Sequence, residues 1–232
     1  MKILAVIPAR GGSKRLPGKN LKILGGKPLV YWTIKISQQF SEIIEVMVTT
    51  DSIEIRDKSL EYNALAPWLR PSELATDNAS SVDVVLHALD WFEKEKGLVD
   101  GILLLQPTSP FRTRKLIQDG LDLFRVGFDS IVSVSPTPFL LNWIYRIESG
   151  RLVPIELKHD KETTEFGPTI DSYIPTGGLY LITPNRLRSA KSFITPETKA
   201  LIVNSQLETL DIDTESDFNL AQLLADKLLP KY

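Results

Sequence analysis

The sequence predicts an α/β protein in which a doubly wound, mostly parallel sheet lies between two layers of helices. Short apolar runs recur along the chain without alternating polar residues, and segments with helical spacing separate them. Uninterrupted apolar runs are typical of strands that are buried on both faces of a parallel sheet. Strands that alternate with helices imply right-handed crossovers and a three-layer α/β/α architecture.

Each expected element follows from one of these two patterns. The expected strands are the apolar runs at residues 3–7, 44–48, 102–105, 131–134 and 178–182. The expected helices have apolar residues at helical spacing or open on a capping side chain, at residues 29–40, 52–62, 81–96, 115–124 and 216–229. Either Thr214 or Ser216 is expected to cap the last helix.

The alternation of strands and helices stops between residues 136 and 175. We expect a hairpin-like excursion in this segment, because two short apolar stretches flank a Ser-Gly turn. Its aromatic side chains, Phe139, Trp143 and Tyr145, either cover a neighbouring subunit or pack onto the parent domain.

The composition limits the classes of function. The chain has 232 residues, of which 43% are hydrophobic and 24% charged, which supports one folded domain spanning residues 1–232. A net charge of −2 argues against a nucleic-acid coat or a polybasic membrane anchor, and no apolar run of about 18 residues marks a membrane span. The absence of cysteine excludes disulfides, Cys-ligated zinc and thiol nucleophiles, and it fits a cytoplasmic protein. His87 and His159 stand apart from any Ser and Asp pattern, so no hydrolase triad is expected.

The most informative segment follows the first expected strand, at residues 7–20. It reads Ile-Pro-Ala-Arg-Gly-Gly-Ser-Lys-Arg-Leu-Pro-Gly-Lys-Asn, and its cations are Arg10, Lys14, Arg15 and Lys19. Gly11 and Gly12 let backbone N–H groups converge on an anion, while the cations neutralise phosphate charge. The segment matches neither the G-x-G-x-x-G fingerprint nor the G-x-x-x-x-G-K-[ST] P-loop. We therefore predict a phosphate-binding loop of another kind, with a solvated basic turn as the alternative.

A pair of carboxylates near the end of the chain forms the second signal. Asp211 and Asp213 stand at i and i+2 after a strand-like segment, so alternation places both on one face. Mg²⁺ is commonly held by one or two carboxylates together with substrate phosphates, and this pair is suited to hold it opposite the basic loop. The alternative is that the acids cap the positive end of the last helix, and the pair taken alone favours that alternative. Its combination with the basic loop favours the metal site.

Two polar segments are expected near the ligand, because ligands of doubly wound folds bind beyond the carboxyl ends of the strands. One is residues 105–112, in which Gln106, Thr108 and Ser109 offer groups that suit a polyhydroxylated substrate. A proline-stiffened turn is the alternative for this segment. The other is residues 70–81, a polar stretch that enters a helix.

In combination these segments resemble the CMP-sialic acid synthetase family, the cytidylyltransferases that activate nine-carbon acidic sugars. The resemblance is carried by residues 7–20, 70–81, 105–112 and 211–213, and it covers most of the chain in order. It implies that the anomeric hydroxyl of a sugar attacks the α-phosphorus of CTP and that pyrophosphate leaves. It also implies Mg²⁺ as cofactor and a homodimer as the assembly.

The resemblance assigns roles to the residues that match the family pattern. Catalytic roles fall to Arg10, Lys19 and Asn20, and the two cations stabilise charge on the phosphates. Contacts to the nucleotide fall to Ala9, Gly11, Gly12, Ser13, Lys14, Arg70 and Ser81. Contacts to the sugar fall to Gln106, Thr108, Ser109, Tyr180 and Phe193, and the metal ligands are Asp211 and Asp213.

The expected sugar pocket departs from that of the sialic acid enzymes. In that family a strand with a tyrosine follows an Asn-Gly pair, and the excursion contributes basic residues toward the sugar carboxylate. Here residues 176–180 read Thr-Gly-Gly-Leu-Tyr, and no arginine occurs between Arg151 and Arg186. A legionaminic acid therefore fits at least as well as N-acetylneuraminic acid, and pseudaminic acid fits less well. Two rival functions stay open, namely a nucleotidyltransferase for Kdo or another sugar and a non-catalytic regulator that binds nucleotide sugars.

Overall fold

The computed structural model describes residues 1–76, 78–137, 144–154 and 172–230. Its central sheet has the strand order β10-β6-β9-β5-β1-β4. In chain order these strands are β1 (Ile3–Pro8), β4 (Ile43–Thr49), β5 (Gly101–Leu104), β6 (Ser130–Pro136), β9 (Tyr173–Ile182) and β10 (Lys199–Ile202). β1 pairs in parallel with β4 and β5, and β10 pairs in parallel with β6, whereas β9 runs antiparallel between β5 and β6. The mostly parallel sheet predicted from the sequence is confirmed.

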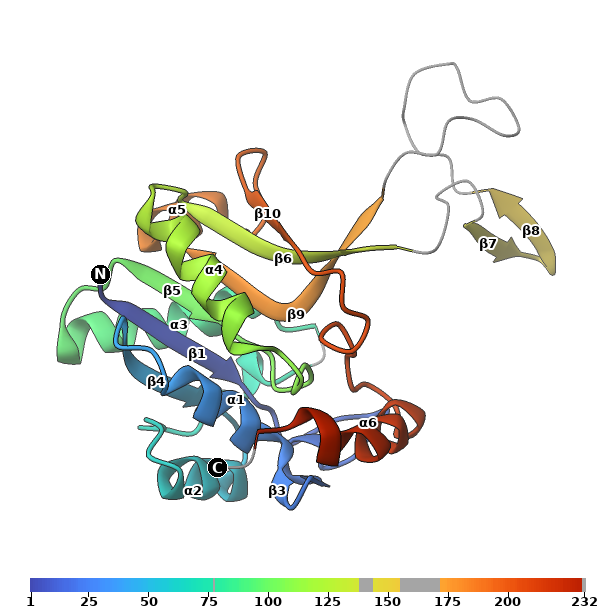
Figure 1. Cartoon of the computed structure of the whole chain (residues 1–232), viewed down its shortest axis with the longest axis horizontal. Coiled ribbons are helices and arrows are strands. Elements are labelled where there is room, and N and C mark those ends of the chain that lie inside the picture. The colour runs from blue at the N-terminus through green and yellow to red at the C-terminus, as the bar shows by residue number, and fades with distance from the viewer. Residues whose placement is uncertain (77, 138–143, 155–171, 231–232) are drawn as a thin grey trace.

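Helices cover both faces of this sheet (Figure 1). One face carries α1 (Leu29–Ser37) and α4 (Arg114–Arg125), and the other carries α3 (Ser81–Lys96) and α5 (Pro184–Ala190). Successive residues of β1 point into opposite apolar layers, with Ile7 packed in the first and Val6 in the second. This two-sided burial explains why the strand segments read as unbroken apolar runs.

Three short helices lie in the connections that follow the strands. α2 (Ile53–Glu61) follows β4, and the Ser52 side chain caps it by accepting the N–H of Ile55. Two 3-10 helices, η1 (Lys19–Leu21) and η2 (Ser72–Leu74), belong to the loops that follow the strands.

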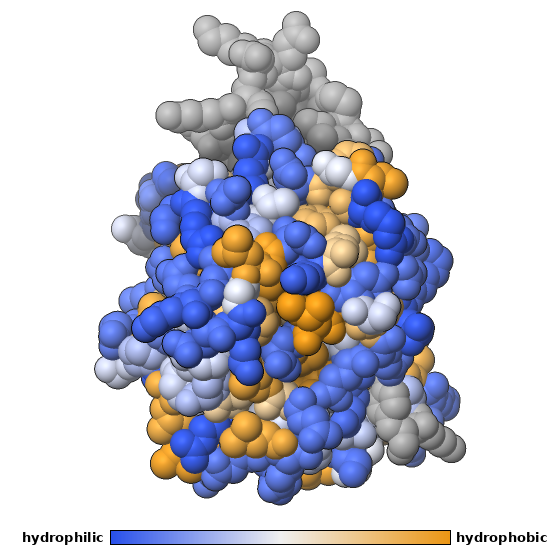
Figure 2. Space-filling view, turned by 90° about the vertical axis from the view of Figure 1, so that its left-hand side faces the viewer, coloured by the Kyte–Doolittle hydropathy of each residue, from blue (hydrophilic) through white to orange (hydrophobic). Residues whose placement is uncertain are grey.

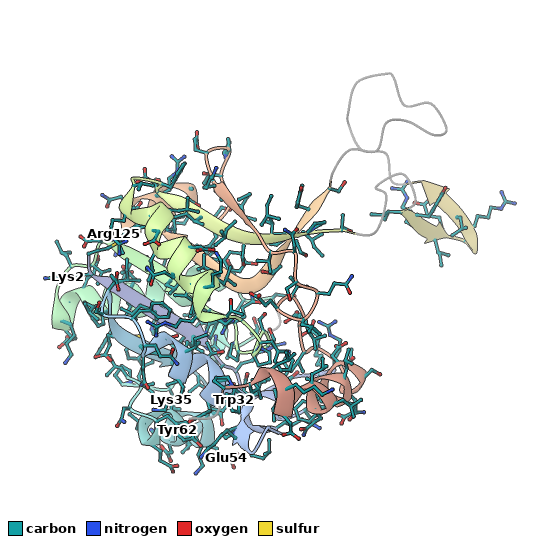
Figure 3. All side chains as sticks on the ribbon, viewed as in Figure 1. Lys2, Trp32, Lys35, Glu54, Tyr62 and Arg125 are labelled. Carbon is teal, nitrogen blue, oxygen red and sulfur yellow. The ribbon has the colours of Figure 1, made fainter. Side chains whose placement is uncertain are left out.

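The last helix, α6 (Glu215–Leu228), packs against α1 and a small hairpin of β2 (Ile23–Leu24) and β3 (Lys27–Pro28). Trp32 lies where α1 meets α6 (Figure 3), and its indole N–H donates to the Leu24 carbonyl at 3.0 Å. Thr214 caps the helix through its side chain, which decides between the two caps expected from the sequence.

Several elements differ from the sequence-based prediction. β10 was not expected because it is a short edge strand whose side chains are mostly exposed, so it has no buried apolar run. α5 was not expected either, although Thr183 and Pro184 form the start signal of a helix. β9 also begins at Tyr173, earlier than the apolar run that predicted it.

A separate antiparallel hairpin, β7 (Tyr145–Glu148) and β8 (Arg151–Pro154), projects away from the sheet (Figure 1). It falls within the excursion expected at residues 136–175. Tyr145 is 47% exposed, so its ring is not buried against the parent domain. Phe139 and Trp143 lie outside the described residues. Contact of this segment with a second subunit stays a prediction.

Figure 2 views the molecule from the end of the sheet at which β1 begins, and it shows small hydrophobic patches among hydrophilic residues. Scattered exposed apolar side chains are normal at the surface of folded proteins. None of the helices in the described part of the chain has the length and apolar character that a membrane crossing requires.

Candidate active site

A cavity of about 330 Å³ opens beyond the carboxyl ends of β1 and β5. Ligands of doubly wound folds bind at this edge of the sheet. The predicted site residues that line it are Arg10, Lys19, Asn20, Arg70, Ser81, Gln106, Thr108, Asp211 and Asp213. Segments that are far apart in the sequence therefore contribute to one cavity.

The basic loop and the carboxylate pair meet across this cavity. Lys19 Nζ lies 2.8 Å from Asp213 Oδ1, and Arg15 Nη2 lies 2.6 Å from Asp213 Oδ2. The Lys19 side chain is only 13% exposed, so solvent screens its charge less than that of a surface lysine. The cationic turn near the start of the chain and the acid pair near its end thus face each other, as the sequence predicted.

Asp211 is the carboxylate of the pair whose pKa is raised. Ile212 is fully buried and its N–H donates to the Thr108 carbonyl at 2.8 Å, which leaves Asp211 and Asp213 to line the cavity. Burial raises the pKa of Asp211, and the neighbouring Asp213 raises it further, whereas a hydrogen bond with Thr108 and the charge of Lys19 act to lower it. A cation held between the two acids would relieve both the burial and the repulsion of negative charge.

Other residues form the cap of α6. Asp217 Oδ2 accepts the N–H of Thr214 at 2.7 Å and the N–H of Asp213 at 3.0 Å, and the Thr214 side chain accepts the N–H of Asp217. This reciprocal pattern is a capping box. Because Thr214 and Asp217 satisfy the start of the helix, the side chains of Asp211 and Asp213 are not needed as caps. The helix-cap alternative for the acid pair loses its support.

The first glycine of the basic loop is engaged within the protein. The Gly11 N–H donates to Asp51 Oδ1 at 2.8 Å. A Cβ atom at Gly11 would lie 3.0 Å from Ser52 Cβ, so glycine also permits this close packing. The N–H of Gly11 is therefore paired within the protein here, and its contribution to an anion nest stays a prediction.

The rest of the loop is held at both ends. Asn20 is 5% exposed, and its Nδ2 donates to the Arg10 carbonyl at 2.9 Å, which ties the end of the loop to its start. Gly18 has a φ of 64°, a left-handed conformation that favours glycine, and it leads into η1. The remaining predicted nucleotide residues of the loop, Ala9, Gly12, Ser13 and Lys14, are not among those that line the cavity.

Arg70 brings a buried cation to the cavity wall. Its Nε and Nη2 atoms are buried without a hydrogen-bond partner in the structure, and Nη2 lies 3.9 Å from Asp51 Oδ1. Burial lowers the pKa of Arg70, an effect that Asp51 opposes and the charge of Arg10 reinforces. Buried donors are almost always paired in folded proteins, so these atoms suit a ligand that offers acceptors.

Arg112 holds the polar segment 105–112 in place, a role that the sequence analysis did not assign. Its guanidinium donates to the Thr33 hydroxyl at 2.7 Å, to the carbonyls of Gly177 and Gly178, and to the carbonyl of Gln106. Burial lowers its pKa to about 9, while the charge of Asp211 acts in the opposite direction. A Cβ atom at Gly177 would lie 2.6 Å from Gln106 Oε1, so this glycine allows the strand to pass close to the loop.

Three of the predicted sugar-binding residues are not among those that line the cavity. Ser109 is 2% exposed and lies beneath the loop, against Gly177. Phe193 is buried in the apolar layer and contacts Tyr180 edge to face, with ring centroids 5.7 Å apart. Burial raises the pKa of Tyr180, and the charge of Asp211 raises it further.

Histidines contribute nothing to this cavity in the described part of the chain. The His87 ring packs against Trp68, with ring centroids 5.1 Å apart, and His159 lies outside the described residues.

Leu74, Thr76, Ala79 and Val84 also line the cavity. Three of these four residues belong to the 70–81 segment. The sequence pattern gave no reason to expect that these particular residues of the segment line the cavity.

Known proteins match this chain in sequence and in fold. The family described as Cytidylyltransferase matches residues 4–122, which include the basic loop and the segment at 105–112. The chain belongs to the cytidylyltransferase family. The CMP-N,N'-diacetyllegionaminic acid synthase of Legionella pneumophila is 42% identical over 97% of this chain and 97% of that protein. The N-acylneuraminate cytidylyltransferase of Escherichia coli O18:K1:H7 is 34% identical over 97% of this chain and 52% of that protein.

Solved structures of cytidylyltransferases confirm the fold. A CMP:2-keto-3-deoxy-manno-octonic acid synthetase complexed with CTP superposes with a TM-score of 0.69 at 18% identity, over 98% of this chain and all of that chain. A 4-diphosphocytidyl-2C-methyl-D-erythritol synthase superposes with a TM-score of 0.67 at 14% identity, over 97% of this chain and 99% of that chain. The resemblance to the enzymes that make CMP-linked acidic sugars, inferred from four sequence segments, is confirmed by the named relatives.

The cavity of this cytidylyltransferase suits a divalent cation only in combination with a ligand. Among the described residues, no group of three or more His, Cys, Asp or Glu side chains is placed to hold a metal. The two carboxylates Asp211 and Asp213 lie at one cavity, and phosphate oxygens are the usual complement of such a pair. The donor set is therefore oxygen alone, which fits a hard cation such as Mg²⁺.

Proposed function

We propose that this cytidylyltransferase transfers CMP from CTP to a nine-carbon acidic sugar and releases pyrophosphate. The observation that supports it most is the meeting of Lys19 and Asp213 across one cavity, where cations for a triphosphate stand opposite carboxylates for its metal. Relatives named for CMP-activated legionaminic, neuraminic and pseudaminic acids support the substrate class.

A legionaminic-type acid is the substrate that we propose first. The relative named for that sugar is 42% identical, whereas those named for N-acylneuraminate and pseudaminic acid are 34% and 29% identical. Kdo is a weaker alternative, because the Kdo-type synthetase shares the fold at only 18% identity. A non-catalytic regulator is also weaker, because Arg10, Lys19 and both aspartates line the cavity together.

Arg10 and Lys19 have the task of binding and stabilising the phosphates. In nucleotidyl transfer the protein contributes mainly position and charge, because the reacting phosphorus supplies the electrophile. Lys19 lies on η1, and Asn20 next to it fixes the carbonyl of Arg10, so both cations are held before substrate arrives. Preorganised charges of this kind stabilise a transition state without reorganisation at the moment of reaction.

Arg70 and Ser81 are proposed to contact the nucleotide, and Gln106 and Thr108 the sugar. All four side chains belong to residues that line the cavity. The two unpaired nitrogens of Arg70 can donate to acceptors of the nucleotide. Contacts of Ser109, Tyr180 and Phe193 with the sugar are proposals too, although Ser109 and Phe193 are buried and Tyr180 is partly buried.

Asp211 and Asp213 are proposed to hold Mg²⁺. Such an ion, when bound, neutralises phosphate charge and activates the oxygens that it contacts. Asp213 currently accepts from both Lys19 and Arg15, so these cations and the metal share one carboxylate. Among the described residues that line the cavity, Asp211 and Asp213 are the only carboxylates, so no separate general base is assigned.

The assembly and location are proposals as well. We propose a homodimer in which the β7–β8 hairpin and its neighbouring residues contact the second subunit. The hairpin projects from the body and exposes Ile147 at 75% and Leu152 at 70%, and exposed apolar side chains of this kind mark protein contacts. We also propose a single domain for residues 1–232 and a cytoplasmic location, which the absence of cysteine suits.

A pyrophosphate-release assay tests the proposal. The purified protein is mixed with Mg²⁺, each common nucleoside triphosphate in turn, and a panel of acidic sugars that includes legionaminic, N-acetylneuraminic and pseudaminic acids and Kdo. We expect release with CTP and a legionaminic-type acid, and loss of release on chelation of the metal. Turnover with another nucleotide or only with Kdo would favour the rival enzyme. Melting shifts with CTP but no pyrophosphate with any sugar would favour the regulator.

A further inference from the structure

The carboxylate of Asp51 stands next to the basic loop although the sequence gave it no role. It lies just past the carboxyl end of β4, which runs beside β1 (Figure 1). Pro8 and Thr49 are register partners at the ends of these strands, and the N–H of Ala9 donates to the Thr49 carbonyl at 3.0 Å. The loops that leave the two strands therefore start side by side.

Asp51 binds the start of the basic loop directly. Its Oδ1 accepts the Gly11 N–H at 2.8 Å, one residue after Arg10. The backbone on either side of Asp51 is ordered, because the N–H of Ser52 donates to the Thr50 hydroxyl at 3.1 Å and the Ser52 side chain caps α2. A rigid turn thus fixes the backbone that carries Arg10.

The same oxygen faces a second element of the cavity. Arg70 Nη2 lies 3.9 Å from Asp51 Oδ1, and the Arg70 N–H donates to the Thr50 carbonyl at 2.6 Å. The Arg70 side chain is 4% exposed, and its charge is repelled by that of Arg10. Asp51 supplies the negative charge that offsets this repulsion, so the two arginines can line one cavity.

We propose that Asp51 is a positioning residue for the nucleotide site. Its carboxylate fixes the loop through Gly11 and keeps Arg70 beside Arg10, although Asp51 is not among the residues that line the described cavity. The inference rests on the proposed function, because it takes CTP to be the nucleotide in the cavity.

Two substitutions separate the hydrogen bond from the charge. Asp51→Asn keeps an oxygen that can accept the Gly11 N–H and removes the charge beside Arg70, whereas Asp51→Ala removes both. Asp57→Asn is the matched control, because Asp57 lies nearby on α2, is exposed and pairs with Arg56. For each variant we measure kcat, the KM for CTP, the KM for the sugar, the salt dependence of the CTP KM, and the melting temperature.

We expect Asp51→Ala to raise the KM for CTP about tenfold or more, as loss of a hydrogen bond to a charged group commonly does. Asp51→Asn should raise it less and should make it more dependent on salt, because the cavity then carries an unbalanced positive charge. The KM for the sugar should stay within about twofold in both variants. Asp57→Asn should behave as the wild type.

Two results would overturn the proposal. One is an unchanged KM for CTP in both variants. The other is a parallel loss in kcat with no selective effect on CTP, which is what a purely structural role predicts. If Asp51→Ala does not fold, the near-isosteric Asp51→Asn decides by the same criteria. Wild-type protein that fails to turn over CTP would refute the proposed function instead, so the two failures are distinct.

Discussion

Replacing Lys19 by alanine is the most direct test of the basic loop. The Lys19 ammonium is 13% exposed and lies 2.8 Å from Asp213 Oδ1 at the cavity. A unit charge about 4 Å from a developing phosphate charge contributes roughly 4 kcal/mol at an effective dielectric constant of about 20. Asp213 cancels part of this, so we expect a loss of about 2–3 kcal/mol in transition-state stabilisation, or roughly 30- to 200-fold in turnover.

The stability of the fold should change little in the same variant. Asp213 keeps Arg15 as a partner at 2.6 Å, so no carboxylate is left unpaired. Breaking a largely buried ion pair is costly mainly when it leaves the other charge uncompensated, so we expect a loss of only about 1 kcal/mol in the free energy of unfolding. The variant should therefore unfold at nearly the wild-type temperature while it loses activity.

Steady-state pyrophosphate release with saturating CTP and sugar measures the effect. Lys22→Ala is the matched control, because Lys22 lies three residues away, pairs with Glu215 at 3.0 Å and is not among the residues that line the cavity. Lys22→Ala should retain wild-type turnover. Lys19→Ala with turnover within about threefold of the wild type would refute the role that we give to the loop.

Three further outcomes follow from the structure. Asp213→Asn should raise the Mg²⁺ concentration needed for half-maximal rate with little change in melting temperature; an unchanged metal dependence would remove the acid pair from the metal site. Gly177→Ala should lower the free energy of unfolding by about 1–3 kcal/mol in a denaturant titration, because the new Cβ would lie 2.6 Å from Gln106 Oε1; wild-type stability would show that the loop gives way. Asp217→Asn should destabilise the protein by about 1 kcal/mol near neutral pH through loss of the cap. Burial acts to raise the pKa of Asp217, but its hydrogen bonds from Thr214 and Asp213 lower the pKa overall. The stability that the Asp217 cap contributes is therefore complete above the ordinary carboxyl pKa and is lost as the pH falls through the lowered pKa. A stability difference that persists in stronger acid would contradict that account.

Much of the fold was predictable because its strands are buried on both faces. The runs in β1 and β5 are apolar at nearly every position, and the runs in β4 and β6 are mainly apolar, so these segments have few alternatives to strands of the sheet. β10 escaped prediction because its pairing with β6 is specified by the neighbouring strand rather than by its own side chains. The antiparallel direction of β9 could not be predicted either, because parallel and antiparallel strands in the core have the same apolar sequence pattern.

The site was predictable where chemistry and strand position coincided. Lys19 and Asp213 could be paired from the sequence because a cationic loop after a strand and a pair of carboxylates are the complementary halves of a site for a triphosphate and its metal. The strand-like segment expected directly before Asp211 is instead a turn. Asp51 does follow a strand, and the rule that ligands bind beyond the carboxyl ends of strands would have found it. The role of Arg112 could not be inferred, because its partners are carbonyl oxygens of β9 and the Gln106 loop, and carbonyls carry no sequence signal.

The entry and exit points of the projecting segment are register neighbours, since Pro136 at the end of β6 pairs with Tyr173 at the start of β9. A short turn could therefore join β6 to β9 and leave the ladder between them intact. Such a trimmed protein would show whether the proposed self-association depends on this segment. It would also make this part of the chain a natural place to exchange segments among relatives with different sugars.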